Sequence, residues 1–275
     1  MSPRSRRRGS PRGNTPSSPP GPGRDQRRLV VTVVCEGKTE RNYLERVNDE
    51  AGQDGRFVLH FDPHAQPGKG FKPSEAVDRA VDVQRRTARD QGEDGVGVEE
   101  PDGGNRAKHH VWVVFDRDEH RDIDEAMRKA HKNGIEVAFS TPSFDLWLLL
   151  HFASGPPPHV SGDNKYLVRK LNAVPHFERY GKSSGGRSSD SKPKVLNDVQ
   201  LTALWEGREH AVMLARKLVD RCSSRRCAAG EKKAERGHDP TCDPLKRDTQ
   251  TDFYRLLELL CADDPKVAGR RRHRT

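Results

Sequence analysis

Three acidic residues directly follow strongly apolar stretches of the sequence. Glu36 comes after Leu29–Cys35, and Asp116 and Asp118 come after His110–Phe115. Carboxylate oxygens are ligands that Mg²⁺ and Mn²⁺ prefer in proteins. On an extended backbone, the side chains of Asp116 and Asp118 would point to the same side. The pattern therefore predicts a Mg²⁺ or Mn²⁺ site in which Asp116 and Asp118 hold metal and Glu36 is a ligand or the general base.

Lys38 adds a positive charge two residues after Glu36, where it could contact a phosphate group. Divalent metal ions activate water and stabilise the charge on a phosphate in the transition state. The predicted chemistry is therefore hydrolysis of phosphate esters, and the alternative is that these acids are ordinary turn residues. Thr39 is the expected N-cap of the helix that follows. For Glu40, in the first turn of this helix, and for His120, exposure on the surface is the favoured interpretation.

Three cysteines and one histidine near the C-terminus have a spacing that resembles a zinc site. Cys222 and Cys227 are followed by His238 and Cys242 in a polar stretch of sequence. The gap of four residues between the first two cysteines is a loose match, so a structural Zn²⁺ is the less favoured interpretation. The odd total of five cysteines, without a secretory signal, favours reduced thiols.

The elements that must position the acids alternate between two sequence patterns. Continuous β-branched and aromatic runs predict buried strands, and amphipathic stretches between them predict helices. The predicted strands are Leu29–Cys35, Arg56–Phe61, His110–Phe115 and Ile135–Phe139. This alternation predicts an α/β fold with a mostly parallel sheet and flanking helices. In such sheets functional groups gather beyond the carboxyl ends of the strands, which is where the three acids fall.

The second half of the chain is less regular. Phe144–Phe152 predicts a buried helix with Trp147 in the core. Further helices are predicted over Tyr166–Leu171, Leu201–Leu218 and Thr251–Leu260. We therefore expect four parts: a disordered Arg/Pro-rich tail over 1–28, a sheet domain over 29–152, a loop-rich and helical C-terminal extension over 153–262, and a disordered basic tail over 263–275.

The net charge of +9 is located at the two ends of the chain. Residues 1–28 hold eight arginines and one acid, and four more arginines stand among residues 270–274. Basic tails can hold nucleic acid through phosphate contacts, and a solubilising role is equally consistent with the pattern. A second basic stretch comprises Lys182, Arg187, Lys192 and Lys194. For this stretch a solvated loop is favoured over contact with a phosphate backbone, because it contains no aromatic residue for base stacking.

The apolar runs are far shorter than the roughly 20 residues that a membrane helix needs. The basic N-terminal residues are not followed by the apolar region of a secretory signal. We therefore expect a cytoplasmic protein that does not cross a membrane.

Several segments resemble known proteins. Val34-Cys-Glu-Gly-Lys-Thr-Glu40 and Val114-Phe-Asp-Arg-Asp118 resemble the Toprim fold that topoisomerases, primases and some nucleases share. With the run Thr141-Pro-Ser-Phe-Asp-Leu-Trp-Leu-Leu-Leu-His-Phe152 and the late segment from Asp243-Pro244 onward, the chain resembles the RloB-like family over roughly residues 29–262. The apolar run that ends at Phe152 is the most specific of these segments.

The resemblance implies a Toprim metal-dependent nuclease that cleaves DNA or RNA in phage defence by abortive infection. It implies an ATPase of the ABC/AAA type, encoded nearby, as a partner. It also implies an extra metal ligand at Asp145, where the family usually has Glu. The alternative is a regulatory or partner-binding subunit with a degenerate Toprim fold, and the retention of all three acids favours the enzyme.

Overall fold

A computed structural model describes most of the chain between residues 29 and 262. The described ranges are 29–64, 70–90, 109–117, 122–160, 162–181, 194–222, 227, 237–238 and 242–262. The two predicted basic tails lie outside these ranges. The predicted site residues Asp118 and His120, and the basic residues Lys182, Arg187 and Lys192, also lie outside them.

Five strands form one sheet in the order β2-β1-β3-β4-β5. The strands are β1 (Leu29–Cys35), β2 (Phe57–Phe61), β3 (His109–Asp116), β4 (Glu136–Thr141) and β5 (Gln250–Thr251). The first four strands are parallel, and the short β5 pairs with β4 in the antiparallel direction. The predicted mostly parallel α/β fold is therefore confirmed.

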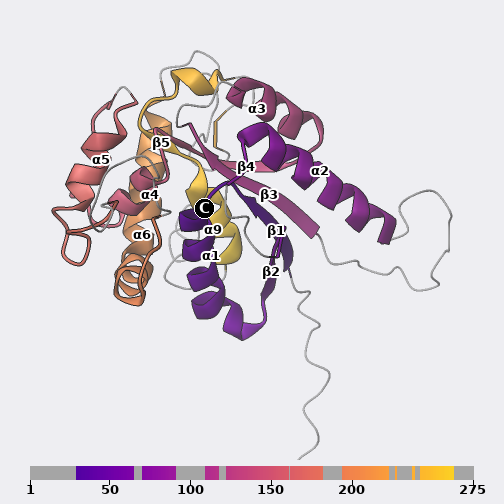
Figure 1. Ribbon diagram of the computed structural model, residues 1–275, viewed down its shortest axis with the longest axis horizontal. Coiled ribbons are helices and arrows are strands. Elements are labelled where there is room, and N and C mark those ends of the chain that lie inside the picture. Colours follow the sequence, from indigo (N-terminus) through magenta and orange to yellow (C-terminus); the bar gives the residue numbers. More distant parts are fainter. Residues whose placement is uncertain are drawn as a thin grey trace, which may run out of the picture.

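Seven α-helices surround the sheet in the described ranges (Figure 1). They are α1 (Lys38–Ala51), α2 (Pro73–Asp90), α3 (Ile123–Lys132), α4 (Asp145–Leu150), α5 (Asn164–Leu171), α6 (Asp198–Asp220) and α9 (Phe253–Leu260). Two short 3₁₀ turns, η1 (Gly52–Asp54) and η2 (Pro244–Lys246), complete the set. Helices α2 and α3 cover one face of the sheet, and the remaining helices lie on the side of α1 and α9.

The alternation of side chains along the strands produces two hydrophobic cores. Val31 and Val33 of β1 point to the larger core, while Val34 points to the smaller core under α2 and α3. The larger core also contains the fully buried Trp147 of α4 and Tyr254 of α9. Residues from the predicted sheet domain and from the C-terminal extension therefore pack in one continuous cluster.

Two local predictions were wrong. Thr251 was expected at the start of a helix, but it belongs to β5, because its backbone pairs with Ser140 at the edge of the sheet. The helix begins only at Phe253. Thr39 was the expected cap of the first helix, but Gly37 occupies the N-cap position, and the Thr39 hydroxyl donates instead to a distant carbonyl.

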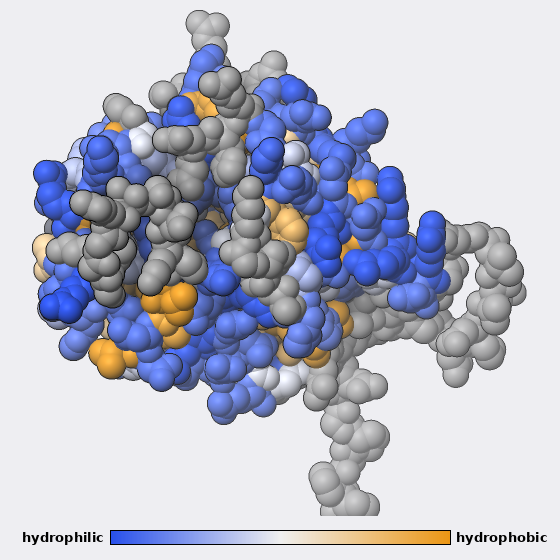
Figure 2. All heavy atoms as spheres, viewed as in Figure 1, coloured by the Kyte–Doolittle hydropathy of each residue, from blue (hydrophilic) through white to orange (hydrophobic). Residues whose placement is uncertain are grey.

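Hydrophilic side chains dominate the coloured part of the face that Figure 2 shows. The exposed large hydrophobic side chains of the described ranges are Val195, Val199 and Leu245. None of the helices in these ranges combines the length and the apolar character that a membrane crossing requires.

Candidate functional site

The structure brings Glu36 and Asp116 together at the carboxyl ends of the neighbouring strands β1 and β3. We call this region of the molecule the acidic edge. They follow or end the neighbouring strands β1 and β3, in which Cys35 is in register with Val114. The Oε2 atom of Glu36 accepts a hydrogen bond from the backbone N–H of Asp116 at 3.0 Å. The backbone N–H of Glu36 donates to the carbonyl of Val114 at 2.9 Å. Two of the three predicted acids therefore have positions set by the parallel strands themselves.

Asp116 is held from the opposite side by the start of α4. It is the last residue of β3 and is only 7% exposed. Its Oδ2 atom accepts a hydrogen bond from the backbone N–H of Phe144 at 3.1 Å. Lys38, the predicted phosphate contact, is the first residue of α1 and is partly exposed at the same edge of the sheet.

Glu40 also belongs to this acidic edge, so the expectation that it faces solvent was wrong. Its side chain is only 6% exposed. A Cβ atom on Gly37 would lie 2.5 Å from the Oε2 atom of Glu40, so the carboxylate occupies the space that a larger residue would fill. Burial raises the pKa of the neighbouring Cys35 thiol, and the charge of Glu40 raises it further.

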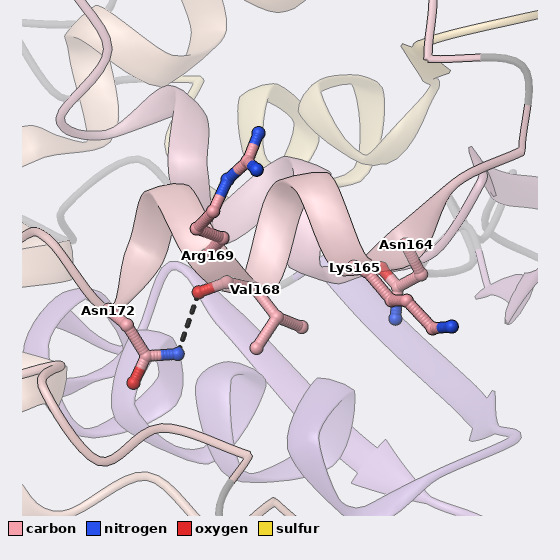
Figure 3. Close-up of a pocket in the computed structure, with 5 residues that line it drawn as sticks. All are labelled: Asn164, Lys165, Val168, Arg169 and Asn172. Carbon is pink, nitrogen blue, oxygen red and sulfur yellow. Dashed lines mark hydrogen bonds between the residues drawn. The ribbon is translucent and has the colours of Figure 1, made fainter.

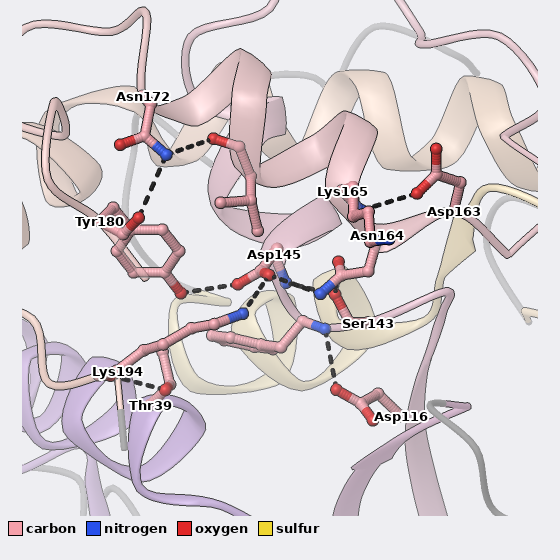
Figure 4. A network of polar contacts seen from close by, with 12 residues as sticks. Thr39, Asp116, Ser143, Asp145, Asp163, Asn164, Lys165, Asn172, Tyr180 and Lys194 are labelled. Atoms are coloured by element: carbon pink, nitrogen blue, oxygen red, sulfur yellow. Dashed lines mark hydrogen bonds and ion pairs between the residues drawn. The ribbon is translucent and has the colours of Figure 1, made fainter. Parts of the chain in front are cut away.

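Asp145 lies at the centre of a buried polar network (Figure 4). The Tyr180 hydroxyl donates to its Oδ1 atom at 2.6 Å. The Lys194 ammonium and the Asn164 amide both donate to its Oδ2 atom, at 2.5 Å and 3.1 Å. The Asp145 side chain is 4% exposed, so these contacts replace water around the charge. Asp145 is thus engaged through both of its oxygen atoms.

The network ties together three distant parts of the chain. The Ser143 hydroxyl donates to Asn164 at 2.6 Å and accepts from the backbone N–H of Asp145 at 3.2 Å. The Thr39 hydroxyl donates to the carbonyl of Lys194 at 2.7 Å, which joins the network to the first turn of α1. The acidic edge is therefore braced by residues that the sequence places up to 155 positions apart.

The electrostatic environment of Tyr180 shows that the network and the acidic edge are close to each other. Burial raises the pKa of Tyr180 well above its usual range, and the charge of Asp145 raises it further. The charges of Glu40 and Asp116 act in the same direction. The charges of these three acids, Asp145, Glu40 and Asp116, therefore act on the same hydroxyl group.

The sequence pattern did not predict the roles of Tyr180 and Lys194. Lys194 was assigned to a solvated basic loop, but its side chain is 30% exposed and paired with Asp145. Tyr180 lies in a loop-rich segment without periodicity. The one available signal was the isolated aromatic residue beside the Gly/Ser/Lys-rich stretch.

The profile of the RloB-like protein family matches residues 31–260, which is most of the chain. This chain belongs to the RloB-like family. Comparison with curated proteins and with solved structures gave no match. The family assignment therefore agrees with the resemblance carried by the apolar run before Phe152.

In this RloB-like protein, a pocket of about 400 Å³ lies along α5 and is lined in part by Asn164 (Figure 3). Its lining includes the cationic side chains of Lys165 and Arg169, together with Val168 and Asn172. Asn164 lines this pocket and also donates to Asp145. The pocket therefore adjoins the network and carries positive charge.

A second cluster of functional residues lies away from the acids. The predicted zinc ligands Cys222, Cys227, His238 and Cys242 converge, with one ligand atom from each lying within 4.8 Å of all the others. The structure thus favours a metal-binding cluster, which was the less favoured interpretation of the spacing. All five cysteines are described, and none forms a disulfide.

Proposed function

We propose that this RloB-like protein is a Mg²⁺- or Mn²⁺-dependent nuclease that cleaves phosphodiester bonds of DNA or RNA in phage defence. We further propose that it acts in the cytoplasm with an ATPase partner. The observation that supports the enzyme best is the hydrogen bond that links the Glu36 carboxylate to the Asp116 backbone at 3.0 Å. It holds the Glu36 carboxylate beside Asp116 at the ends of adjacent parallel strands, where α/β proteins place their functional groups.

The donor set of the acidic edge fits a hard divalent cation. Glu36 and Asp116 offer carboxylate oxygens and no sulfur or nitrogen, and Mg²⁺ and Mn²⁺ favour such ligands. Asp118, one residue beyond the described range, would complete the set. When bound, the ion would supply an activated water and stabilise negative charge on the phosphate.

The residues of the chain supply orientation, proton transfer and positive charge. The Asp116 amide holds Glu36 in place as a ligand or general base. Lys38, at the start of α1, would contact a phosphate oxygen of the substrate together with the positive end of the helix dipole. The Phe144 amide holds Asp116 from the opposite side, so both carboxylates are oriented before substrate binds.

We propose that Asp145 positions the start of α4 and does not bind the metal ion directly. Both of its oxygens accept hydrogen bonds from side chains, and one of the donors is the Lys194 ammonium. A carboxylate that gave up these contacts to bind metal would leave Lys194 without its partner in a largely buried position. Asp145 therefore serves the acidic edge by holding the start of α4.

The basic pocket along α5 supports nucleic acid as the substrate. Lys165 and Arg169 would contact the phosphate backbone beside the network around Asp145, and such contacts supply a large share of the affinity for nucleic acids. The Arg-rich tails would strengthen this attraction without taking part in cleavage.

The test combines metal binding with cleavage by the full chain. We expect the wild type to bind Mn²⁺ in an electron paramagnetic resonance titration and to cleave DNA or RNA when the ATPase partner is present. Asp116→Asn and Glu36→Gln should lower cleavage by about 100-fold or more. Asp49→Asn, which makes the same change at an exposed position of α1, is the control and should match the wild type.

Wild-type protein that binds no Mn²⁺ and cleaves nothing would reject the enzyme and favour the regulatory subunit with a degenerate fold. Equal cleavage by wild type and Asp116→Asn would reject the acidic edge as the catalytic site, whatever the activity.

A further inference from the structure

We propose that Cys222, Cys227, His238 and Cys242 form a structural Zn²⁺ site that fastens the C-terminal segment to the sheet. The site is separate from the acidic edge, uses different donor chemistry and does not depend on the proposed nuclease activity.

The distances between the side chains match the edges of a tetrahedral zinc centre. With Zn–S bonds of about 2.3 Å and Zn–N bonds of about 2.0–2.1 Å, a tetrahedron has S–S edges of about 3.8 Å and S–N edges of about 3.5 Å. The sulfur atoms of Cys222 and Cys242 lie 3.8 Å apart. The sulfur of Cys227 lies 3.4 Å from Nδ1 of His238. Two of the six edges thus match those of a zinc centre, and every pair of ligand atoms lies within 4.8 Å.

The burial of the three cysteines also supports a zinc centre. Within the part of the chain that the structure describes, they form a hydrophobic cluster of their own that is separate from both main cores. Cys227 and Cys242 are each only 2% exposed. The sequence from 228 to 236 contains no apolar residue larger than alanine. Three thiols provide little apolar surface of their own, so a bound metal would explain why these cysteines are buried together.

The donors select zinc and define a structural role. Thiolate and imidazole ligands favour Zn²⁺ over Mg²⁺, and a set of three cysteines and one histidine is an established structural type. Four protein ligands fill a tetrahedral centre and leave no position for substrate. The Nδ1 atom of His238 faces the Cys227 sulfur at 3.4 Å and is the ligand atom in the proposed site.

Two charged residues, Arg247 and Asp252, lie beside the cluster. Arg247 donates to the carbonyl of Cys242 at 3.0 Å and to the carboxylate of Asp252 at 3.3 Å. Arg247 and Asp252 are both 5% exposed. A Zn²⁺ ion with three thiolates carries one net negative charge, which the Arg247 guanidinium offsets. Outer partners of this kind orient metal ligands and stabilise the bound ion.

Asp252 also connects the cluster to the edge strand β5. Asp252 follows β5, whose Thr251 hydroxyl lies 2.8 Å from the Ser140 hydroxyl of β4. Ser140 is in register with Asp116 on the next strand. Zinc would therefore hold β5 against the sheet, two strands from the acidic edge.

A second connection runs through the glycine before the histidine. Gly237 has a φ of +80°, and a Cβ atom there would lie 2.8 Å from the Arg255 side chain. Arg255 pairs with Glu136 at the start of β4, at 2.8 Å. Because Gly237 has no side chain, the backbone before His238 can lie against Arg255 of α9, which is paired with β4.

Elemental analysis of the full chain, purified without added metal or chelator, tests the proposal directly. We expect about one zinc per chain. The chain stripped of metal and then given Co²⁺ should develop the intense visible bands of tetrahedral cobalt with thiolate ligands. Zinc below a tenth of an equivalent together with no cobalt bands would overturn the proposal, and so would stoichiometric iron in place of zinc.

Variants locate the ion. Cys227→Ser and Cys242→Ser should each lose at least nine-tenths of the zinc, while Cys261→Ser, a buried cysteine outside the cluster, should keep it. If Cys227→Ser does not accumulate, mercurial titration of the wild type decides, because release of one zinc should require modification of three thiols. Asp116→Asn should retain its zinc, which separates this result from any failure of the nuclease proposal. Full zinc in Cys227→Ser and Cys242→Ser would overturn the assignment.

Discussion

The acidic edge and the Cys/His cluster represent opposite relations between a site and its fold. Glu36 and Asp116 stand at the ends of strands that are buried on both faces, so the two hydrophobic cores determine where the carboxylates lie. Among the described residues, Cys222, Cys227 and Cys242 form a separate small cluster that belongs to neither core. In the first region the surrounding fold positions the ligands. In the second, the proposed Zn²⁺ would stabilise the local conformation of the chain. The two regions should therefore respond differently to the loss of a ligand.

The largest difference should appear in thermal stability. Cys227→Ser is expected to lower the stability by about 3–5 kcal/mol, because zinc binding supplies the free energy that folds such segments. For a chain of this size that corresponds to a Tm lower by roughly 10 °C. Asp116→Asn should change the Tm by less than about 3 °C, since the surrounding cores remain intact. Differential scanning calorimetry measures both.

The comparison would fail if Cys227→Ser and Asp116→Asn lowered the Tm equally. Excess chelator provides a matched control without substitution, because it should lower the Tm of the wild type and leave Cys227→Ser unchanged.

The difference between the two regions also explains which elements the sequence could predict. The strand β1 was predicted with its observed bounds, Leu29–Cys35, because its apolar pattern extends over seven residues. The strand β5 has only two residues, and its pairing with Ser140 depends on a contact 111 positions away. No local pattern can reveal a strand of this kind.

The same limit applies to the site residues. Glu36 and Asp116 could be predicted because strand ends can be read from the sequence. The sequence pattern gave Glu40 no feature that sets it apart from an exposed helix residue. The absence of a side chain at Gly37 leaves room for its buried carboxylate. Tyr180 and Lys194 reach Asp145 from irregular segments, so their roles follow from tertiary structure alone.

The second prediction tests the polar network that braces the acidic edge. Lys194→Met would leave the Asp145 carboxylate buried with only neutral partners, which should cost about 2–4 kcal/mol. Adding Asp145→Asn should recover part of this loss, because the unpaired charge disappears. Urea denaturation of the two single variants and the double variant provides the coupling energy. Additive losses would show that the pair is not coupled, and a loss of Mn²⁺ affinity in Asp145→Asn alone would favour a ligand role for Asp145.

The third prediction concerns the core behind the acidic edge, where His151 is fully buried. Its Nδ1 atom donates to the Trp147 carbonyl at 2.8 Å, and the Tyr43 hydroxyl lies 3.1 Å from Nε2. Burial lowers the pKa of His151 to about 3, the two backbone carbonyls of α4 oppose this shift, and the charge of His210 from α6 adds to it. The folded chain therefore keeps this imidazole neutral where the unfolded chain binds a proton.

Because the folded pKa is lower than the unfolded value, the stabilisation is complete above about pH 6.5 and is lost as the pH falls toward 3. One such group contributes a slope of up to about 1.4 kcal/mol per pH unit within that window. Urea denaturation between pH 7 and pH 5 should therefore show a shallower decline for His151→Gln than for the wild type. Parallel curves would show that another group controls the acid response of this core.

The smallest effect should come from a single methyl group beside Glu36. A Cβ atom on Gly70 would overlap the carbonyl oxygen of Glu36, which also accepts a hydrogen bond from the Phe71 amide at 3.1 Å. Since backbone atoms cannot turn aside as a side chain does, Gly70→Ala should displace Glu36, cost about 1–2 kcal/mol and weaken Mn²⁺ binding several-fold. Gly155→Ala is the matched control, because its added methyl group meets no atom within 4 Å. Calorimetry and Mn²⁺ titration of the two variants test whether the backbone position of Glu36 determines the affinity of the acidic edge for Mn²⁺. Equal Mn²⁺ affinities would mean that the carboxylates adjust as freely as flexible side chains. Zinc content should be the same in both variants, because neither methyl group lies near the Cys/His cluster.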